Sequence, residues 1–216
     1  DKTGTLTENR MTVVAGWYGN KKFSQDDFAN ASLSTEVKEL VSSHACISRT
    51  AYLVYKDSEG NDLPAPAVIG NKTEGALLML SKNWGYDDEK VRTEAFDENK
   101  DKVYAFNSQK KRSTTIVHNK KDDGCTIYCK GASEWVILDC THYTDENGKP
   151  QPLTAEKRAD LEAYITSMAN LALRTLTLTH KYYDAGTMPK DYMESPPDSS
   201  DLVLDCIVGI IDPLRG

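Results

Sequence analysis

Strand-like and helix-like segments follow one another irregularly along this chain of 216 residues, and that order constrains the fold most. Thr154 precedes the clearest helical pattern, in which Leu161, Tyr164, Ile165 and Met168 recur at helical spacing and therefore share one face. The strand-like segments do not alternate with helices in regular β–α–β units. We therefore predict an α+β fold, with an antiparallel β-sheet flanked by helices.

Hydrophobic periodicity and turn residues place the other elements. We expect strands at 11–18, 102–108, 113–118, 125–129, 173–178 and 202–211, and helices at 35–49, 71–83, 132–139 and from 154 onward. The segments 56–66, 145–152 and 183–200 hold prolines and acidic residues, which predict loops or turns.

The charge balance limits the kinds of partner. Twenty-six Lys and Arg against thirty-three Asp and Glu give a net charge of −7, so we expect no nucleic-acid partner, and an anionic ligand needs a local basic pocket. The five cysteines form no C-x-x-C pair, which indicates free thiols in a reducing compartment. No apolar run approaches the roughly 20 residues that span a bilayer.

The first seven residues, Asp-Lys-Thr-Gly-Thr-Leu-Thr, form the motif with the clearest chemistry. The Asp1 carboxylate can accept a phosphoryl group and become an aspartyl phosphate. Lys2, Thr3 and the backbone of the glycine turn can offset or cradle phosphate charge, and Mg²⁺ is normally required as well. A shorter motif of this kind would be read as an exposed β-turn, but seven uninterrupted residues favour the chemical interpretation.

This motif resembles the phosphorylation motif of P-type ATPases, the ion pumps that cycle through an aspartyl phosphate. Segments 73–77, 130–134, 172–176 and 212–215 are similar to further motifs of that family and follow in its order. The Asp-Pro-Leu-Arg ending and the Phe-Asn-Ser segment look most like the plasma-membrane-type (type IIB) calcium pumps, which calmodulin regulates.

The resemblance implies the ATP-binding domain of a calcium-transporting pump, on the cytosolic face of a membrane protein. It divides the chain into a phosphorylation-domain segment at 1–14, a nucleotide-binding domain at 15–205 and a hinge and return segment at 206–216. Both ends read as cuts in a longer protein. Asp212 and Arg215 would lie at the hinge, and Asp1 and Thr3 would bind Mg²⁺ with partners outside this chain. Calmodulin would act through regions outside it, and the isolated chain is expected to bind ATP without turning it over.

The same resemblance assigns residues to the base of ATP. Phe106 is similar to the aromatic residue that stacks on adenine, although a lone Phe is more often a core residue. Thr73 and Glu74 resemble the pair that contacts the base; their other role is to begin a helix. Lys130 and Gly131 resemble the lysine–glycine pair that lines the adenine pocket, and otherwise form a strand end.

Two cations are assigned to the phosphate side or the pocket wall. Arg174 resembles the arginine that reaches the phosphates. Lys111, five residues after Phe106, looks like the pocket lysine. Ser113 stands where the calcium-pump pattern often has Met, so Lys110 remains an alternative to Lys111.

Two other functions remain open. The chain could be a non-catalytic nucleotide-binding or protein-interaction module that uses its acidic loops at 56–66 and 184–201. A soluble phosphatase or mutase is disfavoured, because such enzymes usually carry a second Asp two residues after the nucleophile and this chain has Thr3.

Overall fold

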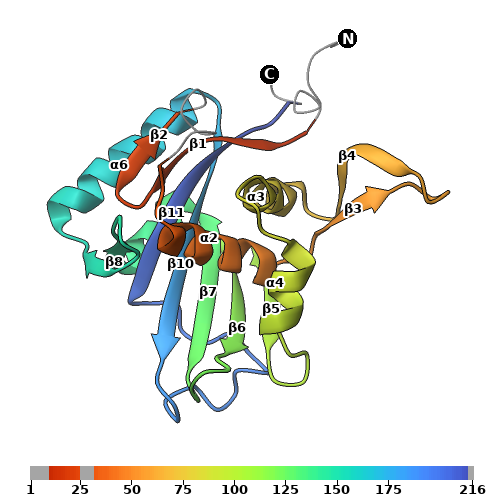
Figure 1. Ribbon diagram of the computed structural model, residues 1–216. Helices are drawn as coiled ribbons and strands as arrows, with labels where there is room; N and C mark the ends of the chain where they lie inside the picture. The colour runs from red at the N-terminus through yellow and green to blue at the C-terminus, as the bar shows by residue number, and fades with distance from the viewer. Residues whose placement is uncertain (1–9, 25–31, 214–216) are drawn as a thin grey trace.

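The computed structural model describes residues 10–24 and 32–213. Its main sheet joins strands in the order β2–β1–β11–β10–β7–β6–β5, and β8 and β9 extend it beside the start of β11 (Figure 1). Every strand pair is antiparallel except β8 with β11. The predicted α+β class is therefore confirmed. The strands are β1 (Thr12–Tyr18), β2 (Lys21–Phe23), β5 (Lys102–Asn107), β6 (Arg112–His118), β7 (Cys125–Ala132), β8 (Cys140–Thr144), β9 (Pro150–Pro152), β10 (Arg174–Tyr183) and β11 (Leu202–Ile211).

The longer helices begin where polar side chains cap them. Ser34, Asn71 and Thr154 each accept a hydrogen bond from the backbone N–H three residues later, which satisfies one free donor of the first turn. The helices expected at 71–83 and from 154 onward are thus confirmed, and Asn71 and Thr154 are their caps. The helices are α2 (Thr35–Ile47), α3 (Lys72–Asn83), α4 (Asp88–Ala95), α5 (Ser133–Val136) and α6 (Ala155–Asn170), and a short 3-10 helix, η2 (Ile137–Asp139), follows α5.

The sheet has a hydrophobic core on each face, because side chains alternate along its strands. On one face, Cys206 and Val208 of β11 pack with Val41 of α2 and Leu77 of α3. On the other face, Ile207 of β11 packs in the cluster that includes residues of α5, η2 and α6. Figure 1 shows α2 and α3 in front of the sheet and α6 beside β1 and β2.

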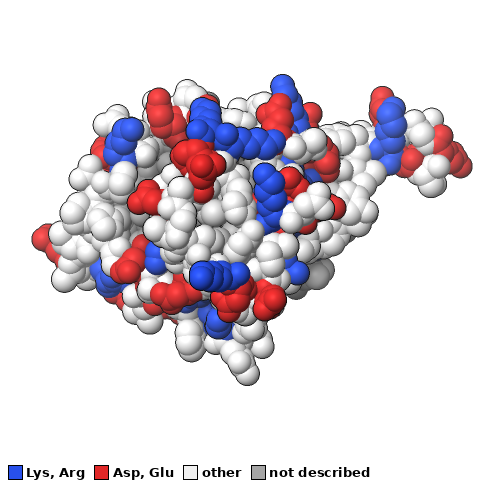
Figure 2. Space-filling view, turned by 90° about the horizontal axis from the view of Figure 1, so that it is seen from below, with Lys and Arg blue, Asp and Glu red and all other residues white. Residues whose placement is uncertain are grey.

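A hairpin of β3 (Tyr52–Lys56) and β4 (Asp62–Ile69) projects from the body (Figures 1 and 2). The expected loop at 56–66 is therefore wrong for its second half. Pro64 and Pro66 lie in β4, which pairs only with β3. Proline has no backbone N–H, and this is tolerated in β4 because the strand has no partner on its other side. Lys56 and Asp62 pair across the hairpin with 2.7 Å between Nζ and Oδ1.

Several other boundaries differ from the expectation. The expected turn at 145–152 ends in β9, which pairs with β8. The strand expected at 173–178 continues to Tyr183, since it stays paired with β7 from Leu176 to Tyr183. β2, β3, α4 and β8 were not expected at all.

The two ends of the described chain lie together, because Thr12 pairs with Ile211 and Tyr18 with Cys206. The strands β1 and β11 run without a break across the expected boundaries at 14/15 and 205/206, and the division into three segments stays a prediction. All five cysteines are buried free thiols. Within the described residues, no helix has both the length and the apolar character that crossing a membrane requires.

Candidate functional site

A cleft of about 640 Å³ opens where the start of α3 meets one end of the main sheet. Its walls come from segments far apart in the sequence: the start of α3, the ends of β5 and β7, and the start of β10. Five residues that the sequence assigned to a ligand line it together: Thr73, Glu74, Phe106, Lys130 and Arg174.

Phe106 is presented to this cleft by an irregularity in the sheet. Tyr104 pairs with Thr114 and Asn107 with Arg112, so Ala105 and Phe106 together face the single residue Ser113. Such a bulge re-aims a side chain, and both residues of the bulge line the cleft. The Phe106 residue is 56 % exposed, so its ring is not a core residue.

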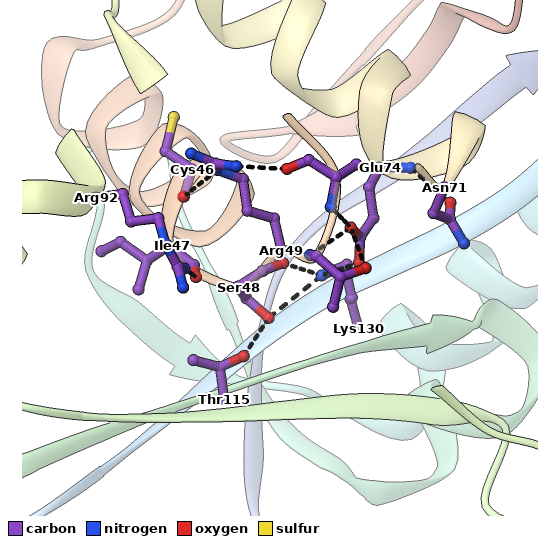
Figure 3. Close-up of polar contacts among 11 residues, drawn as sticks. Cys46, Ile47, Ser48, Arg49, Asn71, Glu74, Arg92, Thr115 and Lys130 are labelled. Atoms are coloured by element: carbon purple, nitrogen blue, oxygen red, sulfur yellow. Dashed lines mark hydrogen bonds and ion pairs between the residues drawn. The ribbon is translucent and has the colours of Figure 1, made fainter. Parts of the chain in front are cut away.

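Lys130 is 5 % exposed, and its ammonium group contacts protein atoms in this structure (Figure 3). Its Nζ donates to the backbone oxygen of Ser48 and to Ser48 Oγ, and it lies 3.6 Å from Glu74 Oε2. Burial lowers the pKa of Lys130, and the neighbouring Glu74 carboxylate opposes part of that shift. Thr115 Oγ1 donates to Ser48 Oγ and so helps to fix the serine that binds the Lys130 ammonium group.

Glu74 fixes the segment that follows α2. Its Oε1 accepts from the backbone N–H groups of Thr50 and Ala51, at 2.7 and 2.8 Å, and from the Thr50 hydroxyl at 3.2 Å (Figure 3). A carboxylate that accepts several N–H bonds is rigidly placed. The Oε2 atom faces Lys130, so one carboxylate joins the 50–51 turn to β7.

Cations also bind the free carbonyl groups at the end of α2. Arg49 Nε donates to the Cys46 oxygen, Arg92 Nη1 to the Ile47 oxygen, and Lys130 to the Ser48 oxygen (Figure 3). Positive groups at a helix C-terminus complement the helix dipole. The wall of the cleft that contains Thr50 is therefore held by charged side chains from three elements.

Arg174 carries the exposed positive charge of the cleft. It is the first residue of β10, and its Nη2 contacts Oδ2 of Asp212 at 3.2 Å. The arginine side chain is 45 % exposed and the aspartate side chain 8 %. An anion in the cleft can therefore reach this guanidinium.

Comparison with known proteins assigns the family. Residues 36–216 match the family described as P-type ATPase, cytoplasmic domain N. The chain belongs to the P-type ATPase family. It is similar to plasma membrane calcium-transporting ATPase 3 of Homo sapiens (34 % identity), to plasma membrane calcium-transporting ATPase 4 of Bos taurus (34 %) and to plasma membrane calcium-transporting ATPase 1 of Gallus gallus (33 %). Each alignment covers 100 % of this chain but only 17 to 18 % of the relative.

Two residues assigned by resemblance to P-type ATPases are absent from the lining of the cleft. Lys111 lies in the β5–β6 turn with a φ of 59°, and the alternative, Lys110, lines a separate pocket with Tyr104 and Pro196. Gly131 is buried in β7, and a Cβ there would lie 2.0 Å from the Lys111 carbonyl oxygen. The close approach at Gly131 is therefore to the neighbouring strand. The roles of these residues toward a nucleotide stay predictions.

Several residues that line the P-type ATPase cleft were not assigned to a ligand from the sequence, among them Thr50, Ser113 and Glu134. Ser113 had a visible signal, its place seven residues after Phe106. Arg112, which follows Lys110 and Lys111 in a run of three cations and would be expected at a solvated edge, is instead buried, and it pairs with Asp139 at 2.8 Å.

The phosphorylation motif lies outside the described residues, as do Asp1, Lys2, Thr3 and Arg215. Within residues 10–24 and 32–213, no group of three or more His, Cys, Asp or Glu side chains could hold a metal ion. The described part of this P-type ATPase domain therefore supplies a ligand cleft and no metal centre of its own.

Proposed function

We propose that this chain is the ATP-binding domain of an ATP-driven cation pump, with calcium as the transported ion. The observation that carries the proposal is the cleft itself, which combines an exposed aromatic ring with a reachable arginine. Aromatic stacking and a cation are the two contacts that a nucleotide needs, one for its base and one for its phosphates. The names of the similar pumps support calcium as the ion.

The base would stack on Phe106, a contact worth about 1–3 kcal/mol. Ala105 and Ala132 are small residues of the same lining, and they leave space for a planar ring. Thr73 and Glu74 would contact the edge of the base. Glu74 Oε1 already accepts three hydrogen bonds, so Oε2 is the oxygen that remains for an amino group of the ligand.

The phosphates would extend toward Arg174, and the terminal phosphoryl group would pass to Asp1 in the whole pump. A carboxylate oxygen of Asp1 would form a bond to the γ-phosphorus while the bond to the bridging oxygen breaks, and ADP leaves. Mg²⁺, when bound, would neutralise charge at the phosphates, and Asp1 and Thr3 are the proposed residues that would hold it.

The whole pump adds the partners that this domain needs. We assign to it the phosphorylation, actuator and transmembrane domains, and a cytosolic position for the present chain. Calmodulin, if it regulates this pump, would act outside residues 1–216. The alternative function, a protein-interaction module without catalysis, would use the projecting β3–β4 hairpin, which exposes Tyr52, Tyr55 and Ile69.

Calorimetric titration of the 216-residue chain with ATP, ADP and GTP tests the proposal. We expect adenine nucleotides to bind with Kd of about 0.1–1 mM, roughly −4 to −6 kcal/mol. Phe106→Ala should remove most of this affinity. Tyr52→Ala is the matched control, because it removes another exposed aromatic ring outside the cleft. Absence of nucleotide binding by the unmodified chain contradicts the proposal and favours the interaction module.

A further inference from the structure

Ser113 is the residue of β6 that lines the cleft. It faces the Ala105–Phe106 bulge on one side, and on the other side it pairs directly with Lys130 of β7. Directly opposed residues of antiparallel strands have Cβ atoms about 5 Å apart on the same face of the sheet. Ser113 therefore lies between the aromatic ring and the buried lysine, and it lines the cleft with both of them.

The hydroxyl group of Ser113 has no hydrogen-bond partner. The residue is 6 % exposed, and its Oγ is one of the buried side-chain oxygens left unpaired in the structure. Among the unpaired buried side chains of the described residues, Ser113 is the one that lines the cleft. A buried hydroxyl without a partner is unfavourable, so this group is ready to gain a bond.

The surrounding side chains do not supply that bond. The ammonium group of Lys130 donates to Ser48 and faces Glu74. Thr115, the next residue of β6 on the same face, donates to Ser48 as well. A serine hydroxyl turns freely among three staggered positions, so Ser113 can swing from the sheet toward the cleft that it lines.

We infer that the Ser113 hydroxyl donates a hydrogen bond to a ring nitrogen of the purine base stacked on Phe106, and is a specificity-determining contact. A ring nitrogen is an acceptor in the plane of the base, and a hydroxyl is a donor that can meet it edge-on. The contact rests on the proposed ATP site and adds a polar group that reads the edge of the base. Stacking alone tolerates every base.

Two measurements on Ser113→Ala test this inference, because the substitution should weaken ATP binding without lowering the thermal stability of the chain. ATP affinity should fall about 3- to 10-fold, the value of one neutral hydrogen bond. The thermal midpoint should stay the same or rise, because the variant removes a buried hydroxyl that bonds to nothing in the free protein. Ser42→Ala is the matched control: it removes another unpaired buried hydroxyl, located on α2 outside the cleft lining, and should leave ATP affinity unchanged.

Deaza analogues identify the ring nitrogen. In 1-deaza-, 3-deaza- and 7-deaza-ATP, one ring nitrogen is replaced by C–H. One of the three should bind the unmodified chain about 3- to 10-fold more weakly than ATP, and this difference should vanish in Ser113→Ala.

Three results separate the possible failures. Unchanged ATP affinity in Ser113→Ala, with affinity lost in Phe106→Ala, overturns the inference and leaves the ATP site intact. A fall in both affinity and thermal midpoint indicates a structural serine and also overturns it. No ATP binding by the unmodified chain overturns the proposed function first, and this inference with it.

Discussion

The guanidinium group of Arg174 contacts a single oxygen of Asp212, with Nε at 3.3 Å and Nη2 at 3.2 Å from Oδ2. Arg174 opens β10 and lines the cleft, and Asp212 directly follows β11. One ion pair therefore joins the ligand cleft to the end of the strand that also pairs with β1. Because these contacts use Nε and Nη2, the third guanidinium nitrogen, Nη1, is the one that a phosphate can bind.

Arg174→Ala should weaken ATP binding about 10-fold, because a charged hydrogen bond contributes about 1.5–3 kcal/mol and the arginine is partly solvated. Adenosine has no phosphate, so its affinity should not change. Calorimetry with ATP and adenosine measures both values. Lys56→Ala removes an exposed cation on the hairpin and serves as the control. An equal loss for both ligands would show that Arg174 acts on the base or on folding.

Glu74→Ala should lower the free energy of unfolding by about 2–4 kcal/mol. The substitution leaves the N–H groups of Thr50 and Ala51 without their acceptor, and it removes the carboxylate beside the buried ammonium of Lys130. Urea denaturation measures the change.

Two variants sharpen this test. Glu74→Gln keeps an amide oxygen as the acceptor but loses the charge, so we expect an intermediate loss. Glu162→Ala changes an exposed acidic residue of α6 and should shift the free energy by less than about 0.5 kcal/mol. If Glu74→Ala unfolds at the same urea concentration as the unmodified chain, Glu74 does not hold the 50–51 turn.

The cleft residues that belong to family-like motifs could be predicted from the sequence. Residues that reach the cleft only because the fold brings distant segments together could not. Phe106, Glu74 and Lys130 stand in motifs whose order implied one pocket, and the structure places them together. Ser48 supports Lys130 from 82 positions away, through a backbone oxygen that no side-chain pattern encodes. Contacts of that kind depend on the register of the sheet and cannot be read locally.

The same difference applies to the elements. The hydrophobic segment Leu202–Ile211 became β11 with the expected bounds, because most of its side chains pack in one or the other of the two cores. β4 contains two prolines and lies in a solvated hairpin, so its pattern indicated a loop. β4 is a strand because it pairs with β3, and the turn-forming residues of this segment gave no sign of that pairing in the sequence.

His44 should make the domain less stable in weak acid. Burial lowers the pKa of His44 well below 6.5, and the charges of Lys130 and His180 add to the shift. Below about pH 6.5, His44 is protonated in the unfolded chain but stays neutral in the folded chain. The free energy of unfolding therefore falls by about 1 kcal/mol between pH 6.5 and 5.5. His44→Leu should remove this part of the acid dependence, as measured by urea denaturation at both pH values. An unchanged slope would contradict the assignment.

His180 should act with the opposite sign and in another pH window. Burial alone lowers the pKa of His180, but the charge of Asp205 and the hydrogen bond to it outweigh burial, and the net shift is upward. Its stabilisation is therefore complete below about pH 6.5 and is lost as the pH rises through the raised value. His180→Gln should flatten the stability profile above pH 6.5 and leave the His44 effect below it. A variant with the unmodified profile above pH 6.5 would exclude the Asp205 pair as its cause.

Gly131→Ala tests whether the glycine is needed for the close contact between strands or for nucleotide binding. The new Cβ would lie 2.0 Å from the Lys111 carbonyl oxygen and 2.7 Å from the Arg112 Cα, and backbone atoms cannot move aside cheaply. Ala132 N–H also bonds to that same carbonyl at 3.0 Å, so the two strands cannot separate without losing a hydrogen bond. We expect a loss of about 3 kcal/mol in the free energy of unfolding.

Gly60→Ala is the control, since its Cβ meets no atom within 4 Å and only its φ of +87° opposes the change, at about 1 kcal/mol. Denaturation of both variants, followed by ATP titration, separates two roles. If Gly131→Ala keeps its stability and loses ATP affinity, the glycine serves the nucleotide; if it loses stability as expected, it serves the contact between β6 and β7.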